Sequence, residues 1–476
     1  MARSEISLPS GTSGVVVAPA GCGKTELVAA TIREHQSLKP ILVLTHTNAG
    51  VTALKQRLVK ANVKPSQYCL YTIDGWALKL AKMFPGLSGL NREIRDVINP
   101  RVAYPLIREA AGKMIADGHI SDPLQASYER LIVDEYQDCS LRQHLIVKFA
   151  SQLLPTCILG DPMQAIFGFN QSDPLIQWDE VISEYGLIGE LTLPWRWINS
   201  GHRALGEWLL KVRANLLAGK GVDLRTGPSE VRWVQLNGSV GDHMTLASAA
   251  RWIGKGVHGG VLVIGSSKNA ASRHKLASTV KGATVVEPVD LNDLVKFCTN
   301  MDFSASNALE LMLDFGSCAM TGIAASTLSR RIKTLAAGRG RKPASAVEQA
   351  ALAFELQRSP SAGAHLLVTM SQEEANRSYR PVMLRGCIRA LQLSASTDGL
   401  TLRDAGIRIR DEQRVFGRAL PKRAVGSTLL LKGLEAEGAV VLCADEMDAK
   451  NLYVAMTRGS AYLSVCSKSA VLSPSL

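Results

Sequence analysis

The sequence has few aromatic residues and no apolar run long enough to cross a membrane. Phenylalanine, tryptophan and tyrosine together make up 5% of the 476 residues. No window approaches the roughly 18 consecutive apolar residues of a membrane-spanning helix. The N-terminal segment MARSEISLPSG also lacks the apolar core of a secretion signal. We therefore expect a soluble chain with no membrane association and a cytoplasmic location.

Paired cysteine motifs are also missing. The nine cysteines are scattered, and they form neither a C-x-x-C pair nor a cluster with histidine. Several lie in apolar, strand-like segments, as Cys157 does in TCILG and Cys443 does in VVLCA. Free cysteine in such surroundings behaves as a small buried apolar residue. The spacing therefore argues against a structural zinc site or a disulfide framework.

Composition favours several folded units and allows a polyanionic partner. Hydrophobic residues make up 46% of the chain, which at this length suits roughly two to four buried cores. The formal net charge is +12, and positive charge favours phosphate backbones because binding releases their counterions. A solvated basic surface explains the same charge, so charge alone leaves both interpretations open.

Short apolar runs alternate with segments of helical periodicity. A first series comprises VVVAPAG (15–21), ILVLT (41–45), LIVDE (131–135) and CILGD (157–161). A second series begins near LTLPW (191–195) and continues with GGVLVIGSS (259–267), ATVVEP (283–288), GAVVLCAD (438–445) and AYLSVCS (461–467). The alternation predicts parallel sheets covered by helices on both faces, in two α/β units that meet near Glu190.

Two stretches interrupt this pattern, and both are predicted to be mostly helical. Residues 84–127 carry arginine at positions 92, 95, 101 and 108. Residues 290–420 include the basic run SRRIKTLAAGRGRK (329–342). Each stretch fits either a solvated helical face or a surface that follows a phosphate backbone, and the sequence leaves both readings open.

The segment APAGCGKT (18–25) follows an apolar strand and opens a helix. Small residues here let successive backbone N–H groups surround phosphates, and the helix N-terminus adds its positive dipole. Lys24 would neutralise the β- and γ-phosphates, and Thr25 would supply a hydroxyl to Mg²⁺. Ala18 departs from the pattern, because it occupies the first glycine position. The predicted nucleotide contacts are Ala20, Gly21, Cys22, Gly23, Lys24, Thr25 and Glu26.

Adjacent carboxylates in LIVDEYQD (131–138) supply the complement to that loop. At the end of a strand, Asp134 would hold the Mg²⁺ and Glu135 would orient and deprotonate the attacking water. An ordinary exposed acidic turn is the alternative, but the apolar strand before the pair and the upstream phosphate-binding loop favour catalysis.

The order of these and further motifs resembles the UvrD/Rep-like helicases of superfamily 1. The matching segments are THTN (45–48), TIDGWA (72–77), VDEYQD (133–138), GDPMQAIFGF (160–169), LPWRW (193–197), LKGLE (431–435) and YVAMTR (453–458). The resemblance implies two RecA-like parallel-sheet domains that clamp ATP between them. It divides the chain into residues 1–190, residues 191–289 with 421–476, and a helical insertion at 290–420. The insertions at 84–127 and 290–420 would then be reduced 1B and 2B accessory domains.

The resemblance also implies roles for single residues. Gln137 and Gln164 would lie beside the γ-phosphate of ATP. Arg196 and Arg458, from the second domain, would reach it only when the cleft closes and would stabilise the transition state. ATP binding would close the cleft and hydrolysis would reopen it, which is the cycle of a motor. The remaining nucleotide contacts would be Gly433 beside the backbone and Glu435 at the sugar.

In that family, single-stranded DNA runs across the top of both domains. Hydroxyl and amide side chains of the first domain would bind phosphates, and aromatic rings would stack on bases. The residues assigned to this track are Thr45, Thr47, Asn48, Thr72, Phe167 and Phe169. Trp76 and Trp195 are expected to be packing residues first.

Departures from the family pattern leave finer points open. No glutamine precedes the phosphate-binding loop where the family reads adenine, so preference for ATP is less secure. Leu429 stands where the family has histidine, and the short insertions favour translocation over unaided unwinding of duplex. Compact chains of this kind resemble the helicase-like subunits that bacterial anti-phage systems such as Gabija pair with an OLD-type nuclease.

The sequence is therefore compatible with three functions of different classes. One is an ATPase that moves 3′ to 5′ along single-stranded or partly duplex DNA, alone or beside a nuclease subunit. Another is a nucleotide-sensing regulatory subunit of a defence or repair complex, with little motor activity of its own. An NTPase unrelated to nucleic acid is a third.

Overall fold

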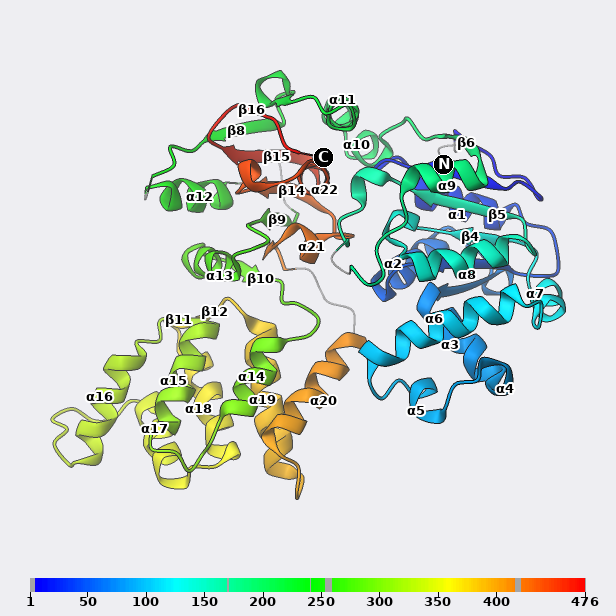
Figure 1. Cartoon of the computed structure of the whole chain (residues 1–476). Helices are drawn as coiled ribbons and strands as arrows, with labels where there is room; N and C mark the ends of the chain where they lie inside the picture. The colour runs from blue at the N-terminus through cyan, green and yellow to red at the C-terminus, as the bar shows by residue number, and fades with distance from the viewer. Residues whose placement is uncertain (1–4, 169–170, 240, 253–258, 416–420, 476) are drawn as a thin grey trace.

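Two six-stranded parallel sheets dominate the molecule. The computed structural model describes residues 5–168, 171–239, 241–252, 259–415 and 421–475. Figure 1 shows the two sheets beside each other, with the helices of residues 292–415 below the second sheet. The predicted α/β class, with two RecA-like units and mostly helical insertions, is confirmed.

The first sheet has the strand order β3-β2-β4-β5-β1-β6, and every pair in it is parallel. Its strands are β1 (Gly14–Val17), β2 (Ile41–Thr45), β3 (Tyr68–Thr72), β4 (Leu131–Val133), β5 (Thr156–Gly160) and β6 (Leu187–Glu190). The helices that cover it are α1 (Lys24–Arg33), α2 (Asn48–Lys60), α3 (Ile73–Met83), α8 (Leu141–Ser151) and α9 (Trp178–Tyr185).

Both faces of the four inner strands β1, β2, β4 and β5 are buried, which explains why these strands are mostly apolar. Leu42 and Leu44 of β2 enter the core beneath α3, whereas Ile41 and Val43 enter the core beneath α1. Successive side chains of a strand point to opposite faces, so a strand covered on both sides has no polar position. The catalytic motifs follow these strands at their carboxyl ends, where ligands of such sheets bind.

The second sheet has the order β10-β13-β9-β14-β15-β8 and is also parallel. Its strands are β8 (Val231–Gln235), β9 (Val261–Ile264), β10 (Ala283–Val285), β13 (Arg423–Gly426), β14 (Ala436–Val441) and β15 (Gly459–Ser467). Its helices are α10 (Trp195–Asn199), α11 (Arg203–Leu217), α12 (Asp242–Arg251), α13 (Ala270–Thr279), α21 (Thr428–Leu431) and α22 (Ala449–Met456). A short antiparallel pair, β7 (Val222–Asp223) with β16 (Val471–Leu472), lies apart from it.

The segment LTLPW (191–195), predicted to begin the second strand series, is not a strand. Leu191 donates one backbone hydrogen bond to Val17. The carboxylate of Glu5 then accepts hydrogen bonds from the backbone N–H groups of Thr192 and Leu193. Pro194, which has no N–H to donate, stands directly before α10. The segment therefore carries the chain from the first sheet to α10.

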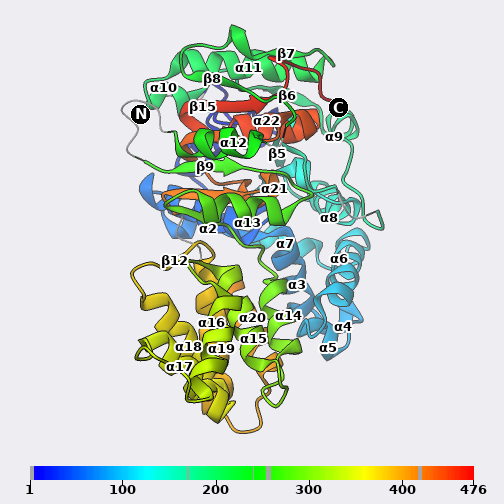
Figure 2. The same cartoon turned by 90° about the vertical axis from the view of Figure 1, so that its left-hand side faces the viewer.

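The two predicted helical stretches are helical. The first contains α4 (Pro85–Ser88), α5 (Arg92–Arg95), α6 (Pro100–Ala116) and α7 (Ser121–Ser127). The second contains α14 (Asn292–Asn300), α15 (Ala308–Ala319), α16 (Ala325–Ala336), α17 (Ala346–Gln357), α18 (Pro360–Gln372), α19 (Pro381–Ser396), α20 (Leu402–Val415) and the small pair β11 (Met320–Thr321) and β12 (Arg377–Ser378). Figure 2 shows this second set as a bundle beneath the sheet, and it has a hydrophobic core of its own. Among the described residues, no helix is both long and apolar enough to span a bilayer.

Arginine–carboxylate pairs attach both stretches to the two α/β units, and the second of these pairs is buried. Arg108 of α6 forms a two-pronged pair with Asp74 at the start of α3, and it also contacts Asp173. Arg380, before α19, forms a two-pronged pair with Glu287, which follows β10. Arg108 is therefore neither part of a solvated helical face nor available to a phosphate backbone, because carboxylates of the protein itself bind its guanidinium.

Candidate nucleotide site

The predicted phosphate-binding loop joins β1 to α1 and is held tightly by the second unit. Gly21 and Gly23 adopt left-handed backbone conformations, with φ of 73° and 89°. A Cβ on Gly21 would lie 2.5 Å from the ring of Trp197, and one on Gly23 would lie 3.0 Å from Trp195. The backbone N–H of Ala20 donates to the hydroxyl of Tyr453 at 3.1 Å. Glycine is needed at both positions, since side chains from α10 press against them.

Lys24 contacts both predicted catalytic carboxylates. Its Nζ lies 3.1 Å from Asp134 and 2.5 Å from Glu135. Burial lowers the pKa of Lys24, but the two carboxylates outweigh burial and raise it above the usual value. Burial also raises the pKa of Glu135, yet Lys24 and Lys432 lower it to about 2. For Asp134 burial dominates, and the pKa stays above its ordinary value.

The backbone at Glu135 is unusual. The residue has φ of 56°, in the left-handed region that non-glycine residues rarely adopt. Its N–H donates to the side chain of Asp134, and its carboxylate accepts from the amide of Gln137. Such positions occur at active sites, where the surrounding structure holds a side chain in a fixed direction.

The two predicted sensor glutamines meet at Asp161. Gln164 donates to the Asp161 carboxylate at 3.1 Å, and the Asp161 backbone N–H donates to the side-chain amide oxygen of Gln137 at 3.1 Å. Asp161 is fully buried, and Gln137 bonds Glu135 in turn. The glutamines and the carboxylate pair therefore belong to one hydrogen-bond network.

The second unit brings its predicted arginines to the same place. The guanidinium of Arg196 forms an ion pair with Glu435 and donates to the backbone carbonyl of Thr457. The backbone N–H of Arg196 donates to the backbone carbonyl of Gly21. Arg458 is buried and donates to the carbonyl of Val454 at 2.8 Å. Burial, with Arg196 next in importance, lowers the pKa of Arg458 to about 10, so the group remains charged at neutral pH. The carboxylates of Glu435 and Glu135 act in the opposite direction.

Three residues of the site were not predicted. Arg57 of α2 donates to the hydroxyl of Thr25 at 3.0 Å and lies 3.5 Å from Glu435. Lys432 donates to Asp138 and to the carbonyl of Gln164. Tyr453 and Lys432 lie inside segments that resemble helicase motifs. Their positions near the site could therefore be predicted from the sequence, but the atoms that they contact could not. Nothing in the local sequence around Arg57 indicates a role.

Other predicted nucleotide contacts surround this centre. Cys22 is buried, and burial raises the pKa of its thiol to about 12. Gly433 has φ of 79°, with open space where a Cβ would lie. Burial raises the pKa of Glu435, but Arg196 and Arg57 outweigh it and lower the pKa. Glu26, in the first turn of α1, lies 3.4 Å from Arg33 at the end of the same helix, and its side chain is 47% exposed.

The residues predicted to bind DNA phosphates lie at the ends of neighbouring strands. Thr45 and Thr72 are paired in β2 and β3. Thr47 and Thr72 cap the helices that follow, because each hydroxyl accepts a backbone N–H three residues later. Asn48 is exposed at the start of α2. The Thr45 hydroxyl is buried and lacks a hydrogen-bond partner among the described residues.

Phe167 is half-buried between the two units. Its ring lies 5.5 Å from that of His46, and the Lys432 ammonium lies 4.6 Å from its centre. Phe169, predicted to stack on a base, lies outside the described residues. Trp76 is fully buried and packs in the core, as predicted.

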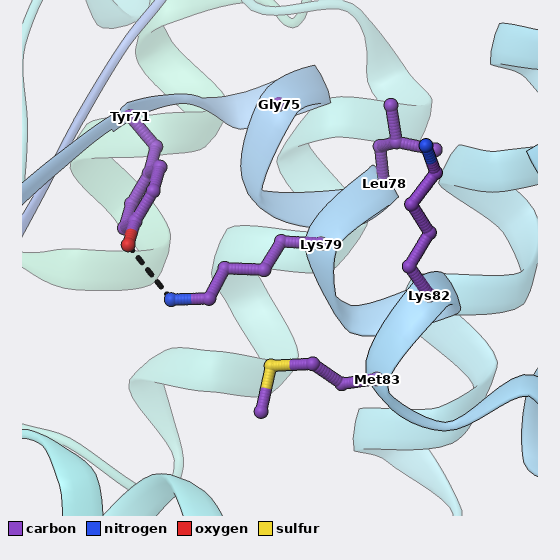
Figure 3. A pocket seen from close by; sticks show the side chains of 6 residues that line it. All are labelled: Tyr71, Gly75, Leu78, Lys79, Lys82 and Met83. Atoms are coloured by element: carbon purple, nitrogen blue, oxygen red, sulfur yellow. Dashed lines mark hydrogen bonds between the residues drawn. The ribbon is translucent and has the colours of Figure 1, made fainter. Parts of the chain in front are cut away.

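A surface cavity of about 460 Å³ lies along α3, apart from the nucleotide residues. Figure 3 shows its lining side chains, with the Lys79 ammonium directed at the hydroxyl of Tyr71, 2.7 Å away. The cavity shares no residue with the network around Lys24 and is therefore a separate feature.

Comparison with known proteins gives a match over the N-terminal part of the chain. Residues 2–100 and 103–178 match the family model of the UvrD/REP helicase N-terminal domain. This match supports a superfamily 1 helicase. The crystal structure of Pif1 helicase from Candida albicans aligns with 98% of this chain and 94% of its own, at 12% identity and a TM-score of 0.36. Comparison with curated protein sequences gives no match.

The match to the helicase N-terminal domain contains the phosphate-binding loop and the acidic pair at Asp134 and Glu135. The arginine side of the site, Arg196 and Arg458, lies beyond the matched residues. Of these, Arg196 packs against the phosphate-binding loop at Gly21. Arg458 bonds the hydroxyl of Thr457, whose carbonyl accepts from Arg196.

Proposed function

We propose that the chain is an ATP-dependent translocase of single-stranded DNA, or a helicase, that hydrolyses ATP between its two sheets. The observation that carries the proposal is the convergence of residues from both units on the phosphate-binding loop. Lys24 of the loop bonds Glu135, and Arg196 of the second unit donates its backbone N–H to the carbonyl of Gly21. A pocket built from both sheets changes shape when they move, so nucleotide binding and domain closure are coupled.

Each side chain then has a task in hydrolysis. Lys24 binds the β- and γ-phosphates, and its departure from Glu135 frees that carboxylate to accept a proton from water. Arg196 and Arg458 stabilise negative charge that develops on the transferred phosphoryl group. Arg196 exchanges Glu435 for phosphate, which leaves Glu435 for the nucleotide sugar.

The residues fit an Mg²⁺ ion that arrives with the nucleotide. Mg²⁺ prefers oxygen ligands and is commonly held by one or two carboxylates and the substrate phosphates. Asp134 and the hydroxyl of Thr25 supply such oxygens beside Lys24. When bound, the ion would offset the negative charge of the phosphates.

The strand track is proposed to cross the carboxyl ends of β2 and β3. Thr47, Asn48 and Thr72 stand at the starts of two helices there, and helix N-termini favour phosphate groups. Phe167 offers a ring for base stacking beside Lys432. If Lys432 moves with the second sheet, it would therefore shift Phe167 at the DNA strand as well as Asp138. Movement from 3′ to 5′ is proposed from the resemblance.

Steady-state ATP hydrolysis with and without single-stranded DNA tests the proposal. We expect low turnover alone and a rise of at least about tenfold with oligothymidylate at low salt, because strand contacts and nucleotide contacts share the same loops. Equal turnover with and without DNA would contradict translocation.

A second candidate is a regulatory subunit that senses nucleotide for a partner, such as an OLD-type nuclease in a Gabija-like defence system. The small helical stretch at α4–α7, with apolar side chains of Met83, Leu87 and Ile98 exposed nearby, favours a protein neighbour. Mass measured in solution, alone and with the product of the neighbouring gene, separates the two candidates. A monomer that binds no partner and translocates alone would exclude this one.

A further inference from the structure

Arg213 of α11 extends into the first sheet's half of the site, although it belongs to no helicase motif. Its Nε donates to Asp161 at 3.0 Å, its Nη2 lies 3.0 Å from the same oxygen, and its Nη1 donates to Glu190 at 2.6 Å. The Arg213 side chain is 8% exposed, and Asp161 is 0% exposed. Both nitrogens approach the same oxygen of Asp161 and the Nε–H donates to it, so the contact is a charge-assisted hydrogen bond between two buried side chains.

Asp161 passes that constraint on to the predicted sensors. One carboxylate oxygen accepts from Arg213 and from the N–H of Met163, and the other accepts from Gln164 at 3.1 Å. The Asp161 N–H donates to Gln137, whose amide bonds Glu135. Two short paths of hydrogen bonds therefore lead from Arg213, one to Gln164 and the other to the proposed base.

The helix that carries Arg213 belongs to the opposite unit. Leu205, Leu209 and Leu216 of α11 lie in the core beneath the second sheet, whereas Leu210 packs against the core of the first. Arg213 thus reaches from one unit into the carboxyl edge of the other, between the end of β5 and the end of β6. A rotation of the second sheet would pull directly on Asp161.

We propose that Arg213 is a positioning residue, which orients Gln164 and Glu135 through Asp161 and ties their placement to the position of the second sheet. The inference rests on the proposed function. It assigns to α11 a part in coupling domain movement to hydrolysis, independently of the arginines that would touch phosphate. Partners that orient a reacting group commonly change activity by about 10–100-fold when removed.

The test is steady-state ATP hydrolysis by the full chain with saturating oligothymidylate. Three variants are compared with the wild type: Arg213→Lys, the double variant Asp161→Asn with Arg213→Met, and Glu190→Gln. Arg213→Lys keeps the positive charge but lacks the planar guanidinium that contacts Asp161 and Glu190 through different nitrogens. The double variant removes both buried charges together, so neither is left unpaired in the interior. Glu190→Gln is the matched control, because it removes the other carboxylate from the same guanidinium, on a side chain that is 46% exposed.

We expect kcat to fall by about 10–100-fold in Arg213→Lys and in the double variant, with the KM for ATP within about twofold of wild type. Glu190→Gln should keep kcat within about twofold. Unchanged kcat in the first two variants would overturn the inference. An equal loss in Glu190→Gln would also overturn it, because Arg213 would then serve only to anchor α11. A wild type without ATP hydrolysis would overturn the proposed function itself, and the inference with it.

Discussion

The ammonium of Lys432 lies 2.5 Å from one carboxylate oxygen of Asp138 and 2.7 Å from the other. Lys432 follows α21 of the second unit, and Asp138 follows β4 of the first. The side chains are 9% and 2% exposed, so the pair is closed to solvent. Burial raises the pKa of Asp138 to about 7, against the opposing effect of Lys432. This contact joins the loop of the catalytic carboxylates to the segment that holds Glu435.

Replacement of Lys432 by methionine should destabilise the protein. The Asp138 carboxylate would be left buried without a partner, which typically costs about 3–5 kcal/mol. Urea unfolding of Lys432→Met and of the double variant with Asp138→Asn measures the effect. The double variant should regain most of the loss, since it buries no unpaired charge. If both variants unfold at the same urea concentration, an unpaired Asp138 carboxylate is not the source of the loss.

Gly21→Ala should weaken nucleotide binding and lower stability. The new Cβ would overlap the ring of Trp197, and a non-glycine residue at φ of 73° costs about 1–2 kcal/mol. Gly11→Ala is the matched control, because its φ is 83° but nothing lies within 4 Å of the added carbon. Thermal unfolding and binding of a fluorescent ATP analogue should separate the two. Equal effects in both variants would show that backbone strain, and not contact with α10, decides the outcome.

The half of the candidate site that belongs to the first unit could be predicted from sequence because it is local. Lys24 stands at the end of a glycine-rich loop, and Asp134 follows an apolar strand. In both cases the neighbouring residues in the sequence indicate where the side chain lies in the fold. The contacts across the units could not be predicted in this way. Lys432 and Asp138 are 294 positions apart, and only the packing of two sheets brings them together. LTLPW was misread because its apolar pattern is that of a strand, while the capture of its N–H groups by Glu5 is a tertiary contact.

The stabilisation that His46 contributes should fall as the pH is lowered from about 6.5 towards 4. Burial lowers the pKa of His46 to about 4, so over this range the unfolded chain binds a proton on His46 and the folded chain does not. Stability from the neutral ring is complete above the unfolded pKa and is lost as the pH falls below it. His46→Phe keeps a ring against Phe167, and the free energy of unfolding of the wild type relative to this variant should fall by about 1–2 kcal/mol between pH 7 and pH 5. The comparison cancels Asp138, whose raised pKa acts in the opposite direction in both proteins. An identical pH dependence in the two proteins would exclude this role of His46.

Glu135→Gln and Arg458→Ala should each reduce kcat by at least about 100-fold. The first removes the proton acceptor, and the second removes charge from the transition state. Binding of ATP by Glu135→Gln should persist, because the amide retains the shape of the carboxylate. Single-turnover hydrolysis with DNA present measures both. Full activity in either variant would remove that residue from the proposed machinery.

The proposed hydrolysis of ATP requires that residues of both units meet at the transferred phosphate. A structure of the chain with Mg²⁺, ADP and aluminium fluoride, bound to oligothymidylate, tests this requirement most directly. We expect fluoride ligands within about 3 Å of the Lys24 ammonium and of the guanidinium groups of Arg196 and Arg458, with the Arg196–Glu435 pair broken. A nucleotide held by the first sheet alone, with Arg458 still bonded to Val454 and Arg196 still paired with Glu435, would contradict it.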